Sequence, residues 1–510
     1  MKRNGYTRRE ALKSIGMATA ALARFVQAEP TKTGRPNILF IVSEDNGQEL
    51  SCYGDPNVRT PNLDSLAKEG VMFRDAYVTQ AVCSPSRSTF FTGLYPHQNG
   101  QLGLATHQYA MFKDFGTSYQ RLKKAGYATG MLGKTHVNPE QYVEKWIDYR
   151  AIKGSNFAKK NLGEYAEHAR TFIEGAGDKP FFLTGNFPDT HWPLQNQVQG
   201  RPMRPLSPGE VKPMPYIGVD NARIRKHIAG YYNCMQRLDG CVGELLAVLK
   251  ESGKMDNTLI VYIGDHGAQM ARAKVGVWEG STRIPFIVRW KGVTNAGAVS
   301  KAMVSTIDLL PTFLDAAGLQ IPAHLPGKSL RPLLSGNLRP DRFRDYLFTE
   351  RNCDSVNHYY PQRTVRDRRF KLILTLLPER TDPAGEFYIG HKREHYRGSP
   401  NAEELKTCPD RVRRAYATYL RPPAVQLYDM ANDPWEFENL AGRSKYAAVQ
   451  QRLYDRLIKW QAETEDPLAD PALLKKLTDE HDALSSRNRR STEGGWKYLQ
   501  YLHPDRLRRG

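Results

Sequence analysis

The stretch CSPSRSTFFTG, residues 83–93, is the part of the sequence from which the expected fold and chemistry follow. It places a cysteine two residues before a proline, an arginine four residues after the cysteine, and a Thr-Gly pair at its end. Pro85 fixes φ and suits a first helical position, so we expect a short helix to start here. Arg87 has a permanent charge and a planar fork of donors that suits an oxyanion. Taken alone, the pair is most simply a buried cysteine beside a solvated arginine.

Four short runs around this stretch have the pattern of buried strands. Three are strongly apolar and one consists of small residues; they span residues 37–42, 128–132, 180–187 and 259–263. Continuous apolar runs are typical of parallel strands covered on both faces. Because open α/β sheets bind ligands outside the carboxyl ends of their strands, we expect the polar residues that follow these runs to meet.

The first run ends in two adjacent carboxylates, Glu44 and Asp45, and the fourth ends in Asp265 and His266. Neighbouring strand residues point to opposite faces, so Glu44 and Asp45 can converge only where the chain leaves the sheet. Their oxygen donors suit a hard cation such as calcium or magnesium. A solvated loop is the ordinary interpretation of such a pair, but loops do not usually follow so apolar a run.

The second and third runs lead to basic and imidazole side chains. Lys134 and His136 lie two residues apart after the second run, so both can face one oxyanion. His191 follows the third run. Each of these residues alone would be unremarkable on a protein surface.

Together these segments resemble the type I sulfatases. Residues 83–93 match the signature Cys-x-Pro-Ser-Arg-x-x-x-x-Thr-Gly at every fixed position, and residues 126–136 match Gly-Tyr-x-Thr-x-x-x-Gly-Lys-x-His. The resemblance runs over roughly residues 36–465. It implies an alkaline-phosphatase-like α/β fold, in which helices sandwich a mixed sheet.

In that family a maturation enzyme oxidises the signature cysteine to formylglycine, whose hydrate is the nucleophile. The resemblance therefore implies formylglycine at position 83 and one Ca²⁺, held by Glu44, Asp45, Asp265, His266 and residue 83. The resemblance also implies a role for each of the other residues. Asp265 would be the base for the attacking hydroxyl, and Arg87 and Lys134 would stabilise the aldehyde hydrate and the developing charge. His136 would remove the second hydroxyl proton, and His191 and Lys274 would bind the sulfate and protonate the leaving group. Glu44 stands where the family usually has Asp, and His266 where it usually has Asn. Both keep donor atoms, so we expect altered metal geometry and not loss of the metal.

Blocks outside the catalytic motifs resemble one branch, the N-sulfoglucosamine sulfohydrolases or sulfamidases. They cover residues 92–94, 97–100, 133–140, 187–191, 360–365, 427–429 with 433–434, 439–441 and 459–461. The implied substrate is a glucosamine N-sulfate at the end of a heparan- or heparin-type chain, with His358 and Arg363 as expected sugar contacts. Lys274 departs from the arginine of sulfamidases, which weakens the substrate prediction more than the class prediction.

Three alternatives stay open. The chain can be another sugar O-sulfatase, or a phosphodiesterase or phosphonate monoester hydrolase of the same superfamily, which often has the Asp-His-Gly sequence found at residues 265–267. A non-catalytic polyanion-binding protein would need neither Cys83 nor the histidines, so it is the weakest option.

The sequence pattern changes in the C-terminal part. Residues 363–374 and 426–429 alternate like half-exposed antiparallel strands, and residues 447–463 have the spacing of an amphipathic helix. We expect a catalytic domain at residues 33–355 and a smaller α+β domain with an antiparallel sheet at 356–510. Residues 346–349 are predicted to form the last strand of the main sheet.

The first residues have the features of an export signal. Residues 7–13 resemble a twin-arginine motif, a weakly apolar stretch follows, and a small-residue site can end the leader at Ala28. We expect residues 1–28 to direct export to the periplasm or the cell exterior. A basic amphipathic helix is the alternative, and Arg24 slightly favours it.

The overall charge bears on the partners. Lys and Arg number 73 against 54 Asp and Glu, a formal net charge of +19, which attracts polyanions of several kinds. The chain has no zinc-finger spacing, basic-aromatic RNA motif or P-loop, and no later run of about eighteen apolar residues. We therefore expect a sulfated saccharide and the maturation enzyme as partners, with no nucleic acid and no stable membrane insertion. The six cysteines imply no dense disulfide framework, and a homodimer stays open.

Overall fold

The computed structural model describes residues 34–153, 162–391, 393–487 and 495–507. Residues 1–28, the expected export signal, lie outside the described residues. Residues 36–510 form one compact unit by their contacts. Among the described helices, none combines the length and the apolar composition that crossing a membrane requires. No described cysteine forms a disulfide.

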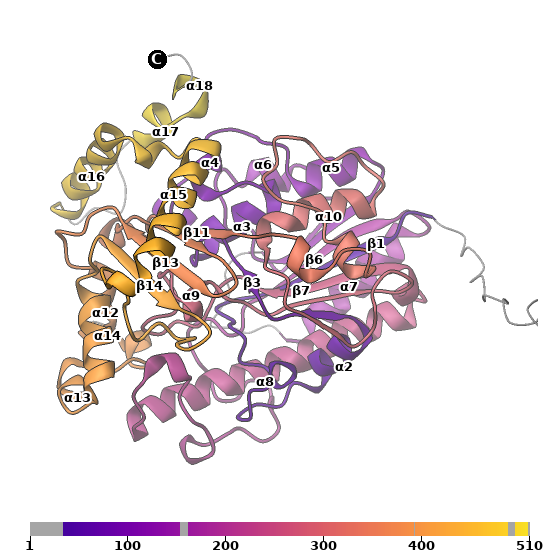
Figure 1. The fold of residues 1–510 in the computed structure, drawn as a ribbon. Coiled ribbons are helices and arrows are strands. Elements are labelled where there is room, and N and C mark those ends of the chain that lie inside the picture. Colours follow the sequence, from indigo (N-terminus) through magenta and orange to yellow (C-terminus); the bar gives the residue numbers. More distant parts are fainter. Residues whose placement is uncertain (1–33, 154–161, 392, 488–494, 508–510) are drawn as a thin grey trace, which may run out of the picture. The chain divides into compact units, whose positions relative to one another are not determined.

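An eight-stranded mixed sheet forms the centre of this unit, in the order β5-β4-β6-β1-β7-β8-β2-β9 (Figure 1). The four predicted strands lie side by side and parallel in its middle: β4 (Ala128–Gly133), β6 (Phe181–Phe187), β1 (Asn37–Ser43) and β7 (Thr258–Gly264). The remaining strands are β5 (Tyr149–Ala151), β8 (Phe286–Trp290), β2 (Val71–Phe73) and β9 (Ala298–Ser300), of which β8 runs antiparallel to β7 and β2. The α/β mixed-sheet prediction is confirmed.

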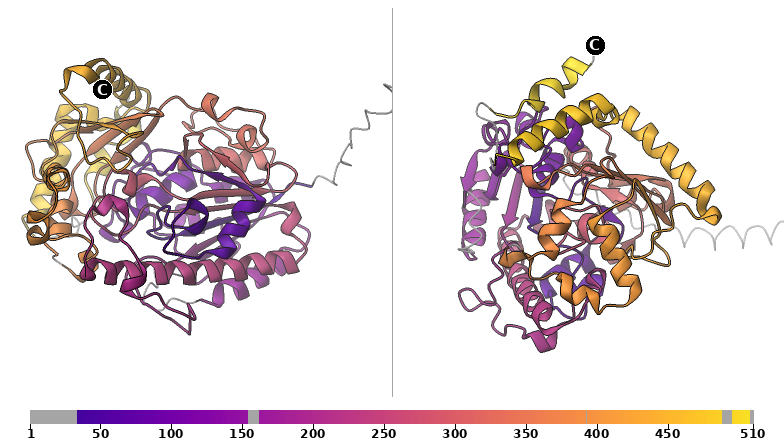
Figure 2. Two further views of the ribbon diagram at one scale, coloured as in Figure 1. Left: turned by 60° about the horizontal axis from the view of Figure 1, so that its bottom comes forward. Right: turned by 90° about the vertical axis from the view of Figure 1, so that its left-hand side faces the viewer.

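Helices cover both faces of this sheet, as the alternation along β1 requires. Leu39 and Ile41 pack into one core with α2 (Pro61–Glu69), α7 (Glu164–Ala176) and α8 (Ala222–Glu251). Ile38, Phe40 and Val42 pack into a second core with α3 (Cys83–Thr92), α5 (Ser118–Lys124) and α10 (Leu309–Ala316). Figure 2 shows α8 as a long helix running along one side of the sheet.

A second, four-stranded antiparallel sheet lies in the C-terminal part. Its order is β11 (Leu347–Arg351), β12 (Gln362–Arg366), β13 (Phe370–Thr375) and β14 (Val425–Asp429). The helix α15 (Ala447–Glu463) covers it, and the ring of Trp460 stacks on Phe348 with centroids 5.0 Å apart. The predicted C-terminal antiparallel sheet is therefore present.

One strand prediction was wrong. Residues 347–349 belong to β11, which pairs with β12 and not with the main sheet. A short apolar run fixes a strand but not its partner, and here the nearest strand in sequence pairs through a short connection. The C-terminal sheet thus begins before the predicted boundary at residues 355 and 356.

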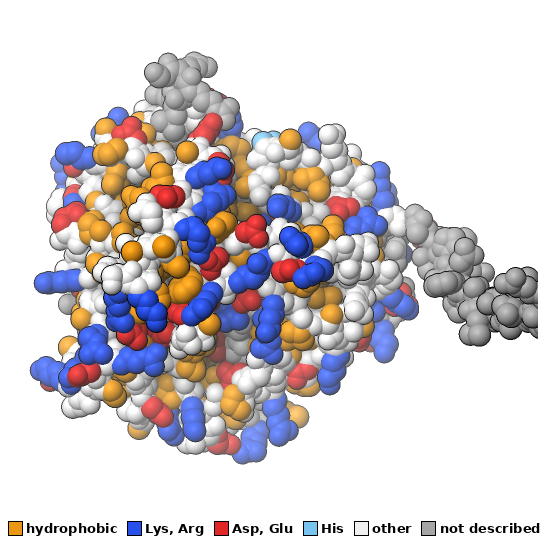
Figure 3. Space-filling model, in the orientation of Figure 1, with side chains coloured by type: hydrophobic (Ala, Val, Ile, Leu, Met, Phe, Trp, Pro, Cys, Tyr) orange, Lys and Arg blue, Asp and Glu red, His pale blue; other side chains and the backbone are white. Residues whose placement is uncertain are grey.

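Buried ion pairs hold the C-terminal sheet to its surroundings. Arg363 of β12 donates to both carboxylate oxygens of Asp466, at 2.6 and 3.0 Å. Lys371 of β13 reaches Glu279 at 3.3 Å and Glu436 at 2.7 Å. The basic excess of the surface is more dispersed: on the face in Figure 3, Lys and Arg side chains run across the middle with Asp and Glu between them.

Candidate active site

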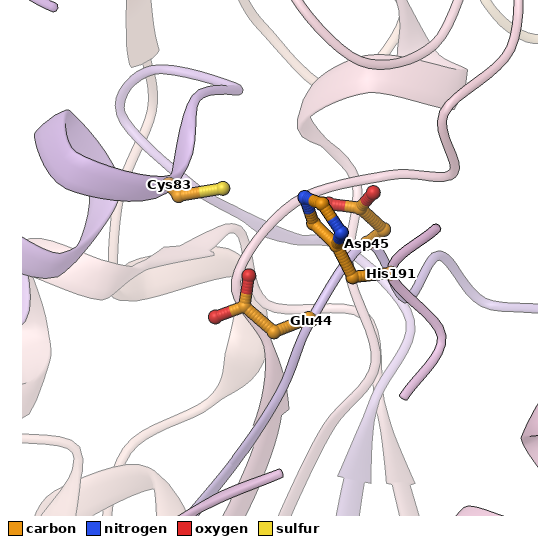
Figure 4. Close-up of side chains that lie close together, drawn as sticks. All are labelled: Glu44, Asp45, Cys83 and His191. Carbon is orange, nitrogen blue, oxygen red and sulfur yellow. The ribbon is translucent and has the colours of Figure 1, made fainter. Parts of the chain in front are cut away.

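The predicted site residues gather at the carboxyl ends of the central strands. Glu44 and Asp45 follow β1, Lys134 follows β4, and Asp265 with His266 follows β7. Figure 4 shows the side chain of Cys83, at the start of α3, pointing toward Glu44, Asp45 and His191. Parallel strands end at the same edge of a sheet, which is why segments so far apart in sequence meet here.

Cys83 is the first residue of α3, so the helix begins two residues before the position that we predicted for its start. Pro85 lies in the first turn, where its missing N–H would have no helical partner in any case. The thiol is 1% exposed, and its Sγ lies 3.3 Å from Nε2 of His266. Ser86 donates to the carbonyl of Asp265 at 2.7 Å, which fixes the start of the helix against the end of β7.

Glu44 lies between two cations. Arg87 donates to one of its oxygens, and Nζ of Lys134 donates to the other at 2.8 Å. Burial opposes the charge of this carboxylate, but Arg87 and Lys134 together hold the pKa of Glu44 well below its usual range. Arg87 also donates to Oδ1 of Asn186 at 2.8 Å. Sequence analysis missed Asn186, and the available signal was a polar side chain inside the apolar run of β6.

Asp45 is paired with Lys274. The Lys274 ammonium lies 2.9 and 3.0 Å from the two Asp45 oxygens. Burial opposes the charge of Asp45, but Lys274 outweighs it and lowers the Asp45 pKa. The backbone of Asp45 is left-handed, with φ 49°, and its N–H donates to Oδ1 of Asp265 at 2.9 Å. This turn lets consecutive side chains face one site, as expected where the chain leaves the sheet.

The pKa values of Asp265 and His266 are both raised, for different reasons. Burial, followed by the nearby Glu44, raises the pKa of Asp265 to about 6. Burial alone would lower the pKa of His266, but the neighbouring Asp265 raises it to about 9. Nε2 of His266 lies 3.5 Å from Asp45 and 3.6 Å from Asp265, while Nδ1 lies 2.9 Å from the Gly267 carbonyl. The second oxygen of Asp265 is buried and receives no hydrogen bond from a described residue.

Burial lowers the pKa values of His136 and His191, which favours their neutral forms. Burial, with Lys134 second, lowers the pKa of His136 well below its usual range, and neither ring nitrogen has a hydrogen-bond partner among the described residues. Burial lowers the pKa of His191 to about 3, and its Nδ1 lies 2.8 Å from the Trp192 carbonyl. His191 is thus placed to donate through Nδ1 and to present Nε2 elsewhere.

A buried ion pair positions the loop that carries His191. Asp189 accepts two hydrogen bonds from Arg237 of α8, at 2.8 and 2.9 Å. Backbone hydrogen bonds join the same loop to Glu44, from Thr190 N to Glu44 O at 2.7 Å and from Glu44 N to Asp189 O at 3.1 Å. Arg237 of α8 therefore supports the site, although it lies outside the motifs that sequence analysis identified.

The two predicted sugar contacts lie in different environments. Nδ1 of His358 lies 2.8 Å from Asp354, its ring packs edge-on against Phe387, and its role stays a prediction. Arg363 is fully buried, and its guanidinium is taken up by Asp466 and, at 3.1 Å, by Asn352. The structure contradicts a sugar contact for Arg363. A basic residue in a distal motif suggested function, whereas its burial gives it a structural role.

The clustered donors fit a hard cation. Two overlapping groups each bring their potential ligand atoms within 4.8 Å of one another: Glu44, Asp45, Cys83 and His191, and Cys83, Asp265 and His266. Carboxylate oxygens are what Ca²⁺ and Mg²⁺ prefer, and the unbonded oxygen of Asp265 leaves one such donor available. A thiol is a poor ligand for these ions, so an oxygen at position 83 would suit the site better.

Comparison with known proteins agrees with this geometry. Residues 36–319 match the family described as Sulfatase, and residues 264–381 match the family described as N-sulphoglucosamine sulphohydrolase, C-terminal. The chain is 30% identical to human N-sulphoglucosamine sulphohydrolase over 489 residues, covering 87% of this chain and 93% of the human protein. It is 28% identical over 451 residues to an ulvan-active sulfatase of Formosa agariphila, covering 86% and 82%.

A solved structure of a protein in complex with its substrate, D-glucosamine-2-N,6-O-disulfate, shares the fold. Its TM-score is 0.63 at 21% identity, with 85% of this chain and 99% of that chain covered. The match to the sulfatase family spans more than half of the chain, and it includes the signature cysteine, the acidic cluster and the basic residues around them. The chain belongs to the sulfatase family, as a sulfuric ester hydrolase near the N-sulfoglucosamine sulfohydrolase branch.

Proposed function

We propose that this enzyme removes the N-sulfate from a terminal glucosamine of heparan- or heparin-type glycans. The observation that carries the proposal is the arrangement of Arg87, Lys134 and Lys274 around the carboxylates beside residue 83. Three buried cations around two adjacent carboxylates suit a sulfate group. The human relative, whose name states this activity and which matches over nearly its full length, supports the substrate.

We further propose that residue 83 is matured to formylglycine and that Glu44, Asp45, Asp265 and His266 hold one Ca²⁺. In the structure the Cys83 Sγ stands in for the oxygen of the matured side chain. When present, the hydrated aldehyde supplies an oxygen nucleophile, and the calcium ion neutralises sulfate charge. The formylglycine side chain and the calcium ion would both be held by this buried cluster. Most of the cluster's ligand atoms are carboxylate oxygens, which suit calcium.

The chain's own residues have chemically distinct tasks in this scheme. An ammonium has three donors, of which Lys274 turns at most two to Asp45, so at least one can bind a sulfate oxygen. Asp265, with a pKa of about 6 and an oxygen without a donor, can take the proton of the attacking hydroxyl. His136, neutral and with both nitrogens available, can take the second proton. A sulfate beside His191 would raise its pKa and so prepare it to protonate the leaving amine.

We also propose, from residues 1–28, that the protein is exported by the twin-arginine route to the periplasm or the cell exterior. Maturation of residue 83 is a separate requirement: a host that lacks a formylglycine-generating enzyme would need to co-express one. An intact N-terminus on protein recovered from outside the cytoplasm would contradict removal of this leader.

Two measurements test the catalytic proposal. Mass analysis of the peptide that carries residue 83 should show an aldehyde in active protein, and only unmodified thiol in fully active protein would end the formylglycine mechanism. Sulfate release should be fastest from N-sulfoglucosamine and absent in Cys83→Ala. Faster release from a 6-O-sulfated sugar would move the assignment to an O-sulfatase.

One alternative has a specific observation behind it. His266 follows Asp265 in the Asp-His-Gly sequence that phosphodiesterases and phosphonate monoester hydrolases of the superfamily often have. Cleavage of a phosphate diester at a rate equal to or above that of N-sulfoglucosamine would favour this second function.

A further inference from the structure

A second cavity, separate from the candidate active site, lies beside residues 47–57, which follow Glu44 and Asp45 in the chain. Its volume is about 450 Å³, within the range of small-molecule sites, and none of the candidate catalytic residues lines it. Segments far apart in sequence enclose it: residues 47–57 after β1, residues 212–215 before α8 and Trp435 after β14, together with Arg74, Tyr232 and residues 279–283. No step of the proposed reaction uses this cavity.

Two of its basic side chains have no acidic partner. Arg74 and Lys212 both line the cavity, and neither forms an ion pair with a carboxylate in the described ranges of the chain. Arg283, also in the lining, differs because its guanidinium lies 3.2 Å from Asp75. Unpaired cations in a concave, partly apolar surface attract an anionic ligand.

The acidic side chains of the lining are already engaged. Asp55 accepts hydrogen bonds from Tyr232 at 2.6 Å and from Asn57 at 2.8 and 2.9 Å. Glu279 is paired with Arg366 at 3.0 Å. The charge of Glu279 is therefore compensated by Arg366, and neutral donors satisfy the oxygens of Asp55. Arg74 and Lys212 remain as the basic groups of the lining that are free to pair with an acidic ligand.

Glu49 is the remaining carboxyl of the lining. Burial, followed by Asp55, raises the pKa of Glu49 to about 7, so it carries only part of its negative charge near neutral pH. It accepts a hydrogen bond from Tyr231 at 3.2 Å. A partly protonated carboxyl can also donate to a ligand oxygen, which suits a hydroxyl-rich compound.

Aromatic groups complete the lining. Trp435 is half-buried, its ring packs against Tyr216 with centroids 5.5 Å apart, and its indole N–H makes no hydrogen bond to another described residue. Flat aromatic rings with a polar edge are well suited to bind a ligand that has one apolar face and polar groups at its rim. A pyranose ring is such a ligand.

We propose that this cavity binds an acidic saccharide, whose ring packs on Trp435 and whose carboxylate or sulfate is held by Arg74 and Lys212. The enzyme would then have a glycan-binding site separate from the catalytic site. The proposal does not depend on which sulfate the catalytic site removes, so its failure would leave the proposed function intact.

The test uses the full chain with Cys83→Ala, so that no probe is consumed. The probes are an unsulfated disaccharide of glucuronic acid and N-acetylglucosamine, its sulfated form, and the neutral disaccharide N,N′-diacetylchitobiose. Binding is followed by calorimetry and by tryptophan fluorescence, with Trp435→Phe identifying the contribution of that ring. The variant Arg74→Ala/Lys212→Ala is compared with Arg59→Ala/Lys68→Ala, which removes the same charge from exposed positions outside the lining.

We expect at least one acidic disaccharide to bind with a Kd below about 1 mM, and Arg74→Ala/Lys212→Ala to weaken it about tenfold or more. The control variant should bind as the parent does, and the fluorescence change should disappear in Trp435→Phe. Binding of the sulfated probe alone would identify sulfate as the preferred anion. Equal binding of the neutral disaccharide, unchanged affinity in Arg74→Ala/Lys212→Ala, or no saturation by any acidic probe up to about 10 mM would overturn the proposal.

Discussion

Replacing Arg363 by methionine should destabilise the protein without changing how it binds substrate. The guanidinium is fully buried and donates to Asp466 at 2.6 and 3.0 Å. Methionine fills a similar length but leaves the Asp466 carboxylate with two protein donors, Gln461 at 2.9 Å and the Leu468 N–H at 3.1 Å. Removing one partner of a buried ion pair costs about 3–5 kcal/mol, because the other charge stays buried.

The expected change in melting temperature follows from the size of the protein. The compact unit spans residues 36–510, and at about 2.1 cal/mol/K per residue its unfolding entropy is about 1 kcal/mol/K. A loss of about 3–5 kcal/mol therefore lowers Tm by about 3–5 °C. Adding Asp466→Asn should recover part of this loss, since it removes the uncompensated charge. Arg456→Met, which breaks a half-exposed pair with Glu463, is the control and should cost less than about 1 kcal/mol.

The assay combines scanning calorimetry with steady-state kinetics on N-sulfoglucosamine. Burial would raise the pKa of Asp466, but Arg363 outweighs it and holds that pKa below its usual range. The stabilisation is therefore fully present above about pH 4, the unfolded value, and is lost as the pH falls further. An unchanged Tm together with a KM raised about tenfold would show that Arg363 contacts substrate and would refute this reasoning.

Three further predictions concern the site and its surroundings. Lys274→Ala should lower kcat/KM about 100-fold or more, while Lys274→Arg should keep most activity because it retains the charge beside Asp45; equal sulfate release by wild type and Lys274→Ala would contradict this role. Glu49→Gln should gain stability over wild type as the pH rises from 4 to 8, by up to about 3 kcal/mol, because the raised pKa of Glu49 makes its ionisation unfavourable in the folded state; a pH-independent difference in Tm would count against it. Chelation should lower both activity and Tm, and calcium at about 100 times its Kd should restore about 2.7 kcal/mol of stability; the absence of any calcium-dependent Tm shift would exclude the proposed metal site.

The sequence predicted the central sheet well because its strands are covered on both faces. Such strands are almost continuously apolar, and their ends are therefore easy to locate and to associate with the polar residues that follow. The apolar run at residues 346–349 was equally visible, but pairing depends on the neighbouring strands and not on the run itself. Strand partners are thus less predictable than strands.

The residues predicted from the motifs lie close together in the structure, but sequence analysis did not foresee the places that burial decides. Arg363 was expected to meet a sugar, and Asn186 was passed over inside an apolar run, although it accepts a hydrogen bond from Arg87. The second cavity could not be predicted, since residues 47–57, 212–215 and 435 come together only in the folded chain. Sequence spacing carries no information on contacts of this kind.

The tie between Asp189 and Arg237 has a consequence for interpreting sequence variants. Arg237 lies in the middle of α8, outside every signature motif, and is 1% exposed. Yet the loop that it holds, which carries His191, is hydrogen-bonded through its backbone to Glu44. The positions of His191 and Glu44 therefore both depend on one side chain of α8. A substitution at position 237 would thus displace His191 and Glu44 together. It would lower catalytic activity although no reacting group had been altered.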